Sequence, residues 1–124
     1  MQAIDDFGSI REELRRFAKE RDWEKFHTPK NLLMALTGEL GELVSLFQWL
    51  TPTETSQLML DPVEAEKVRD ELADVLIYAI RLADVLDVDP KAAVRSKMAK
   101  NAVRYSVERS RGHARKAPQQ TVKN

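Results

Sequence analysis

Apolar residues recur every three or four positions along four stretches of the chain, which is the spacing of amphipathic α-helices. These stretches span residues 3–20, 31–49, 62–86 and 90 to about 108. Asp61-Pro62 and Asp89-Pro90 open the last two, because an Asp N-cap followed by Pro suits the first turn of a helix. The pattern predicts an all-α fold, in which the first helix contributes to the core and carries no chemistry.

Two connections separate the first three helices. Pro29 is expected to interrupt regular structure before the second helix begins at residue 31. Residues 50–61 are rich in turn-forming residues and join the second and third helices directly. These two helices are therefore expected to form an antiparallel hairpin.

The second predicted helix carries two glutamates, Glu39 and Glu42, within an apolar run. On a helical wheel with Leu32 at zero, the apolar residues fill an arc from about 320° through zero to about 120°. Glu39 falls at about 340°, inside that arc, and Glu42 falls at about 280°, on its border. A carboxylate at a core position costs several kcal/mol unless it is paired, hydrogen-bonded or coordinated to a metal. Glu39 therefore needs a partner.

The third helix repeats this spacing with Glu71 and Asp74, and Tyr78 follows on the same edge of its apolar arc. If the two helices pack antiparallel, four carboxylates meet across one seam. Four like charges cannot share a small site without cations or strongly raised pKa values. Oxygen ligands suit hard divalent ions such as Mg²⁺ or Mn²⁺. The alternative is a pair of solvated acidic faces, which single pairs of this kind usually form.

The loop of residues 21–31 combines aromatic, cationic and amide side chains, with Trp23 and His27 among them. These two residues are candidates for binding a ligand. In the alternative interpretation, the aromatic side chains close one end of the helical core.

The fourth helix carries a polar stripe formed by Lys97, Asn101 and Arg104, at about 120° to 180° on a wheel with Ala92 at zero. The two cations can be snorkelling side chains that border the core. They can equally neutralise phosphate oxygens, which a site built around four acids would require of its neighbours.

Composition narrows the function classes. The 124 residues contain 20 Lys and Arg against 20 Asp and Glu, and this zero net charge argues against a general nucleic-acid binder. The absence of cysteine excludes disulfides, thiolate zinc sites and a catalytic Cys. No apolar run reaches membrane-spanning length, and the start has no secretory pattern, so a cytoplasmic location and no membrane partner are expected.

The third helix also carries Ile77 and Val85 outside its main apolar arc. A helix that is apolar on more than one side is either fully buried or part of a subunit interface. A chain of this length buries a modest core, so an oligomer is expected.

The spacing Glu39-x-x-Glu42 followed by Glu71-x-x-Asp74 resembles the metal motif of the all-α nucleoside triphosphate pyrophosphohydrolases of the MazG type. The similarity covers residues 12–116 and is closest to the branch that contains the dCTP pyrophosphatases. The flanking segments that carry it are Asp22-Trp23-Glu24-Lys25-Phe26-His27, Asn31-Leu32-Leu33, Phe47-Gln48-Trp49, Val75-Leu76-Ile77-Tyr78, Ser96-Lys97-Met98 and Asn101-x-x-Arg104-Tyr105.

The resemblance implies a four-helix bundle core of the all-α NTP pyrophosphatase type, assembled as a homotetramer with sites near subunit interfaces. It implies Mg²⁺-dependent hydrolysis of a nucleoside triphosphate, with dCTP or a 5-modified dCTP first, to the monophosphate and pyrophosphate. The four acids would hold the metal, and Lys97 and Arg104 would bind phosphate oxygens. Candidates for base and sugar contacts are Trp23, His27, Trp49, Tyr78 and Asn101.

Two alternatives stay open. One is a pyrophosphohydrolase for another nucleotide, such as dUTP, dATP or phosphoribosyl-ATP. The other is a helical interaction protein whose acidic edges bind cations without catalysis. In either case, we expect residues 1–116 to form one domain and residues 117–124 to form a mobile polar tail.

Overall fold

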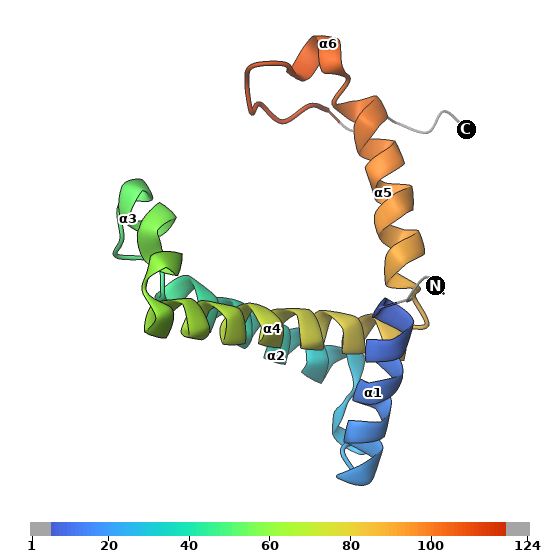
Figure 1. Cartoon of the computed structure of the whole chain (residues 1–124). Helices are drawn as coiled ribbons and strands as arrows, with labels where there is room; N and C mark the ends of the chain where they lie inside the picture. Colours follow the sequence, from blue (N-terminus) through green and yellow to red (C-terminus); the bar gives the residue numbers. More distant parts are fainter. Residues whose placement is uncertain (1–5, 119–124) are drawn as a thin grey trace, which may run out of the picture. The chain divides into compact units, whose positions relative to one another are not determined.

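The computed structural model describes residues 6–118, which contain helices and no β-strand, so the predicted all-α fold is confirmed. The elements are α1 (Asp6–Glu20), η1 (Glu24–Phe26), α2 (Pro29–Ser45), α3 (Pro52–Gln57), η2 (Leu58–Leu60), α4 (Pro62–Val85), α5 (Pro90–Arg104) and α6 (Val107–Ser110) (Figure 1). They fall into two compact units, Met1–Val88 and Asp89–Asn124. The four-helix count of the core stays a prediction.

Helix caps explain where the boundaries differ from the expected ones. Pro29 begins α2 instead of interrupting the chain before it, because the Thr28 side chain accepts a hydrogen bond from the Asn31 backbone N–H. The helix ends at Ser45, and turns occupy residues 46–49, which we expected to be helical.

The connector between α2 and α4 also contains more structure than expected. Thr51 and Glu54 form a capping box that starts the short helix α3, and the 3₁₀ helix η2 follows it. Asp61 then caps α4 as predicted, by accepting hydrogen bonds from the backbone N–H groups of Val63 and Glu64. The connector therefore fixes the chain reversal with two successive caps.

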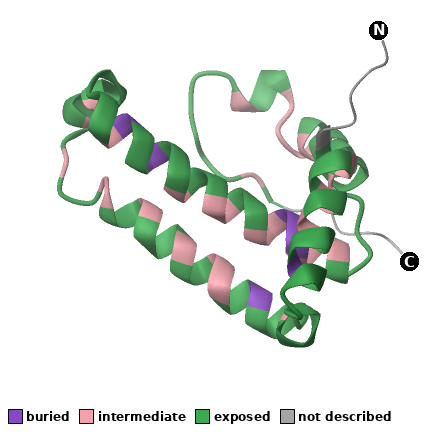
Figure 2. Cartoon of the chain, turned by 60° about the horizontal axis from the view of Figure 1, so that its bottom comes forward, coloured by how far each residue is buried: buried purple, intermediate pink, exposed green. Residues whose placement is uncertain are grey.

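Helices α2 and α4 form the predicted hairpin and lie side by side in both ribbon views (Figures 1 and 2). The core beneath them is small. Its buried apolar residues, shown in purple in Figure 2, are Ala18, Leu32, Ala65, Val68 and Ile80.

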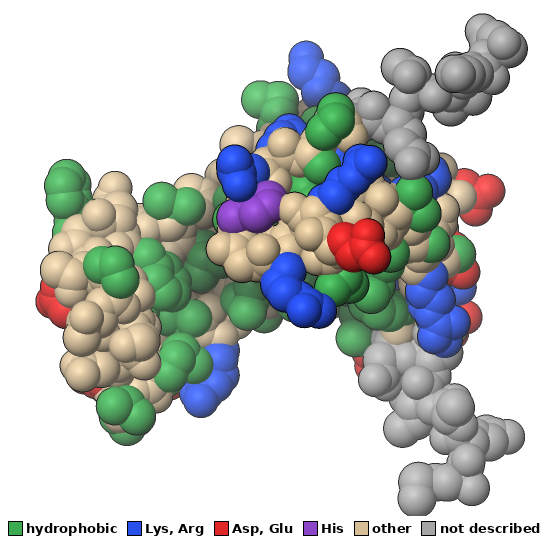
Figure 3. Space-filling view, turned by 90° about the horizontal axis from the view of Figure 1, so that it is seen from above, with side chains coloured by type: hydrophobic (Ala, Val, Ile, Leu, Met, Phe, Trp, Pro, Cys, Tyr) green, Lys and Arg blue, Asp and Glu red, His purple; other side chains and the backbone are tan. Residues whose placement is uncertain are grey.

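Much of the predicted apolar arc stays exposed in the single chain. Leu40 and Val44 on α2 and Leu72 and Leu76 on α4 each expose about half of their surface, and Figure 3 shows hydrophobic side chains reaching the molecular surface. Among residues 6–118, no helix combines the length and the apolar character needed to cross a bilayer. The exposed face is the kind of surface that a protein partner covers.

A charged network fastens α1 to α4. Arg15 on α1 donates two hydrogen bonds to the Asp84 carboxylate, at 2.8 and 2.5 Å. Arg81, one turn before Asp84 on α4, donates a third at 3.0 Å. The Asp84 and Arg81 side chains are only 6% and 10% exposed, so this ion pair is shielded from water. The Arg15 hydrogen bonds hold the pKa of Asp84 below its ordinary value.

The second unit contains α5 and α6. The Arg104 guanidinium, at the end of α5, donates two hydrogen bonds to the Ala117 carbonyl oxygen, at 2.7 and 2.5 Å, and lies over the Tyr105 ring. Helix α5 ends at Arg104 and not near residue 108, and it has no buried residue. The predicted mobile tail lies, from residue 119, outside the described residues.

We expect Asp84→Asn to lower the free energy of unfolding by about 3 kcal/mol at neutral pH, because it leaves the Arg81 charge buried without a full counter-charge. The folded-state pKa of Asp84 lies below its ordinary 3.8. The ionised carboxylate therefore makes its full contribution to the free energy of unfolding above pH 3.8. It loses that contribution as the pH falls through the folded-state pKa. Urea denaturation at neutral and acidic pH should show the two proteins converging in acid.

Asp22→Asn is the matched control, since Asp22 pairs with Lys25 at the surface. It should change the free energy of unfolding by no more than about 0.5 kcal/mol. Equal losses in the two variants would contradict the role given to the buried pair.

Candidate metal centre and the adjoining cavity

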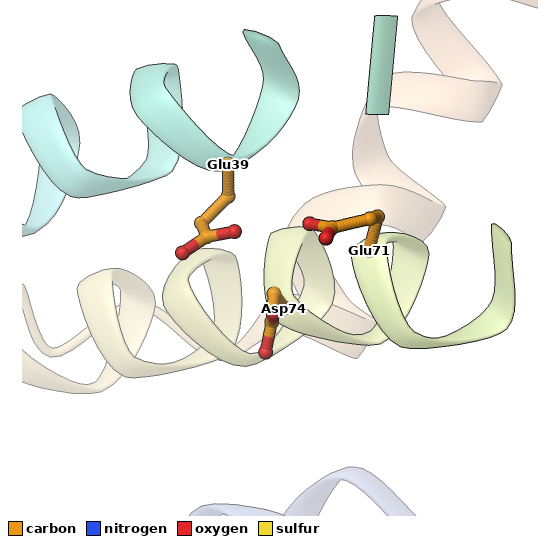
Figure 4. A group of neighbouring side chains, drawn as sticks. All are labelled: Glu39, Glu71 and Asp74. Atoms are coloured by element: carbon orange, nitrogen blue, oxygen red, sulfur yellow. The ribbon is translucent and has the colours of Figure 1, made fainter. Parts of the chain in front are cut away.

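Three carboxylates meet where α2 faces α4. Glu39 extends from α2 toward Glu71 and Asp74, which lie one turn apart on α4 (Figure 4). One oxygen from each residue lies within 4.8 Å of the others, and all three side chains are partly buried. The antiparallel hairpin thus brings together acids that are more than thirty positions apart in the sequence.

The electrostatics of this group are unfavourable without a counter-charge. Burial raises the pKa of Glu39, and the neighbouring charges of Asp74, Glu71 and Glu42 raise it further. The Oε2 atom of Glu71 is buried and has no hydrogen-bond partner among the described residues. A buried carboxylate oxygen without a donor is costly, so this site requires a positive charge or a proton.

The group fits a hard divalent cation. It offers only oxygen donors, which Mg²⁺ and Mn²⁺ prefer over softer ligands. A bound cation would satisfy the free Glu71 oxygen and relieve the repulsion that raises the pKa of Glu39.

Glu42, the fourth predicted ligand, lies outside this group. Its side chain is exposed one turn beyond Glu39 on α2, yet its charge contributes to the raised pKa of Glu39. Its role as a metal ligand stays a prediction.

A cavity of about 360 Å³ adjoins the carboxylates and shares Asp74 with them. Helix α4 supplies one wall, helix α1 another, and the segment around η1 a third. Its lining residues are Leu14, Phe17, Trp23, His27, Asp74, Ile77, Tyr78 and Arg81. The cavity is mainly apolar and aromatic with a few polar groups, which is typical of a small-molecule site.

Aromatic contacts order the part of the cavity wall that α1 and the segment around η1 supply. The Trp23 ring packs edge-on against Phe17, with centroids 5.8 Å apart, and lies 6.3 Å from the His27 ring. The Nδ1 atom of His27 accepts a hydrogen bond from Arg81 Nε at 3.1 Å. Burial and the Arg81 charge lower the pKa of His27.

The structure gathers Trp23, His27 and Tyr78 around one cavity, and their role in ligand contacts stays a prediction. Trp49 lies outside this cavity, with its side chain 87% exposed. The second unit contains the other candidates for substrate contacts, which are Lys97, Asn101 and Arg104.

Sequence reasoning missed several residues of the site. Leu14 and Phe17 of the first helix line the cavity, although we expected that helix to contribute to the core alone. The absence of chemistry on this helix stays a prediction. Arg81 was also missed, although a lone Arg in the apolar run of residues 75–86 is a usable signal. Such a residue has to find an acceptor when the helix packs.

Comparison with known proteins gives a consistent picture. Residues 35–118 match the MazG-like family. The chain is 51% identical over 107 residues to dCTP pyrophosphatase 1 of Mus musculus and 49% identical over 109 residues to that of Homo sapiens. These alignments include 83% and 85% of this chain, but the chain spans only 63% and 64% of the two relatives.

The fold is also similar to a solved structure, the crystal structure of a pyrophosphatase from Archaeoglobus fulgidus DSM 4304. The TM-score is 0.78 and the sequence identity is 36%. The match includes 86% of this chain and 97% of the archaeal one.

We expect Mg²⁺ to stabilise the wild-type protein, by about 2.7 kcal/mol at one hundred times the dissociation constant. Glu39→Gln and Asp74→Asn should lose this response. Without metal, both variants should be at least as stable as wild type, because each removes one of several clustered like charges. Thermal unfolding with and without Mg²⁺ measures both effects.

Glu66→Gln is the control, since it removes an exposed acid from α4, the helix that carries Glu71 and Asp74. It should keep the full Mg²⁺ response. A parallel Glu42→Gln variant tests the fourth predicted ligand. An undiminished Mg²⁺ response in Glu39→Gln would rule out the assignment of the three carboxylates.

Proposed function

Because this chain belongs to the MazG-like family, we propose that it hydrolyses a nucleoside triphosphate to the monophosphate and pyrophosphate. The carboxylate group of Glu39, Glu71 and Asp74, with its unpaired buried oxygen, is the observation that carries this proposal. The similarity to dCTP pyrophosphatase 1 of mouse and human makes dCTP or a 5-modified dCTP the first substrate to test.

Mg²⁺ is the proposed cofactor, with Mn²⁺ as a chemically similar substitute, held by these three acids and by Glu42. When bound, the ion would screen the triphosphate charge and activate a water molecule for attack at the α-phosphorus. A carboxylate of the group would accept the proton that this water releases.

The cavity next to Asp74 is the proposed site for the base and sugar. Trp23 and Tyr78 offer aromatic faces for stacking, and His27 offers a hydrogen-bonding ring nitrogen. The cavity shares Asp74 with the carboxylate group, so a nucleotide whose base fills it has its phosphates directed toward the acids. This adjacency supports a nucleotide over inorganic pyrophosphate as the substrate.

Phosphate contacts are assigned to Lys97 and Arg104, and a further polar contact to Asn101. Arg104 uses two N–H groups on the Ala117 carbonyl and keeps others for phosphate oxygens. Trp49 is proposed to contact the nucleotide in the assembled oligomer, since its ring is exposed in the single chain.

The proposal includes a homotetramer located in the cytoplasm, where nucleoside triphosphates are made and used. The exposed apolar residues of α2 and α4 support assembly, because a monomer seldom leaves such a face in water. No nucleic-acid partner is proposed, since Lys and Arg are balanced by Asp and Glu.

Bond choice separates this reaction from removal of the terminal phosphate. Attack at the α-phosphorus breaks its bond to the bridging oxygen, and pyrophosphate leaves as one group. Hydrolysis of dCTP in ¹⁸O-water should therefore place the label in the nucleoside monophosphate and none in pyrophosphate, as mass spectrometry would show. Lys97→Met should lower kcat/KM about tenfold through loss of a charged phosphate contact.

Lys91→Met, at the exposed start of the same helix, is the control and should leave kcat/KM unchanged. Label in orthophosphate, with a nucleoside diphosphate as the other product, would overturn the proposed reaction.

A further inference from the structure

Measured over the whole residue, Arg81 is the least exposed charged residue among those described, with 8% of its surface exposed. It belongs to none of the sequence motifs that indicated the metal site. A buried guanidinium is costly unless its N–H groups find acceptors. Asp84 accepts from Nη1 at 3.0 Å and supplies the counter-charge, and His27 Nδ1 accepts from Nε at 3.1 Å.

The second of these hydrogen bonds determines the protonation of His27. Arginine has only donors, so Nδ1 of His27 has to be the unprotonated acceptor. An imidazole with a free Nδ1 and one proton is neutral and carries that proton on Nε2. The hydrogen bond thus selects one of the two tautomers, where an isolated ring would populate both.

Packing restricts the same ring. The Trp23 ring lies 6.3 Å from the His27 ring at an angle of 58°, and Trp23 itself packs against Phe17. His27 is therefore held between an aromatic neighbour and a buried cation that is itself fixed by Asp84. Within residues 6–118, Nε2 of His27 has no protein partner, although His27 lines the cavity.

We infer that Arg81 is a positioning residue that holds His27 in its neutral Nε2–H tautomer, so that the cavity offers a fixed hydrogen-bond donor to an acceptor atom of the bound base. A carbonyl oxygen or an unprotonated ring nitrogen of a pyrimidine is an acceptor of this kind. The statement about the ligand rests on the proposed function, and the statement about the tautomer does not. The lowered pKa of His27 agrees with a neutral ring at pH 7.

The tautomer can be measured directly on the nucleotide-free protein. The chain has two histidines, His27 and His113, so His113→Gln assigns the ring signals in a long-range ¹H–¹⁵N correlation spectrum. We expect His27 to show a protonated Nε2 and an unprotonated Nδ1. A protonated Nδ1, or signals averaged over both tautomers, would overturn the inference. This test needs no substitution of Arg81.

Arg81→Met keeps an apolar stem and removes the donor. His27 should then show averaged tautomer signals, and KM for the best nucleotide substrate should rise about tenfold with kcat nearly unchanged. Arg15→Gln is the matched control, since it weakens the same network at its exposed end. It should lower stability while leaving the His27 signals and KM as in wild type.

A double-mutant cycle separates positioning from general damage. In a His27→Gln background, Arg81→Met should raise KM no further, because the group through which it acts is already gone. Independent, additive effects on KM would overturn the positioning role. If the expected tautomer is present but no nucleotide is hydrolysed, the proposed function fails and the assignment of Arg81 to His27 stands.

Discussion

The rest of this structure depends on one electrostatic constraint, which is the mutual repulsion of three partly buried carboxylates. Glu39, Glu71 and Asp74 present oxygens within 4.8 Å of one another, and the buried Glu71 oxygen lacks a donor among the described residues. Isolated helices would not hold such charges together. The α2–α4 hairpin does so because its buried apolar contacts fix the register in which the acids face each other. The repulsion lowers the stability of the fold and leaves a site whose charge a cation could neutralise.

Helix α4 connects this site to the cavity through its own periodicity. Asp74 and Arg81 are seven residues apart, so they lie on the same face about 10 Å apart along the helix axis. Ile77 and Tyr78 fill the face between them. One rigid element therefore sets the spacing between the acids and the polar wall of the cavity, and the Arg15–Asp84 ion pair holds α1 against it.

The sequence predicts the parts of this arrangement that depend on local pattern. Helical periodicity and Asp-Pro caps locate the helices, and the place of Glu39 within an apolar arc identifies it as a residue that needs a partner. Pattern could not show that Leu40 and Val44 stay exposed, because exposure depends on what else covers the hairpin. Nor could it show that Arg81 reaches His27, since that contact joins residues 54 positions apart. The place of Glu42 outside the group depends on helix rotation, which a wheel approximates only coarsely.

The central claim is that the three carboxylates form a divalent-cation site. A crystal structure of the protein soaked in Mn²⁺, with data collected at the manganese absorption edge, tests it most directly. The account predicts an anomalous peak bonded to oxygens of Glu39, Glu71 and Asp74. A protein that hydrolyses nucleotides with Mn²⁺ but shows its manganese elsewhere, with these three side chains free of metal, would contradict it.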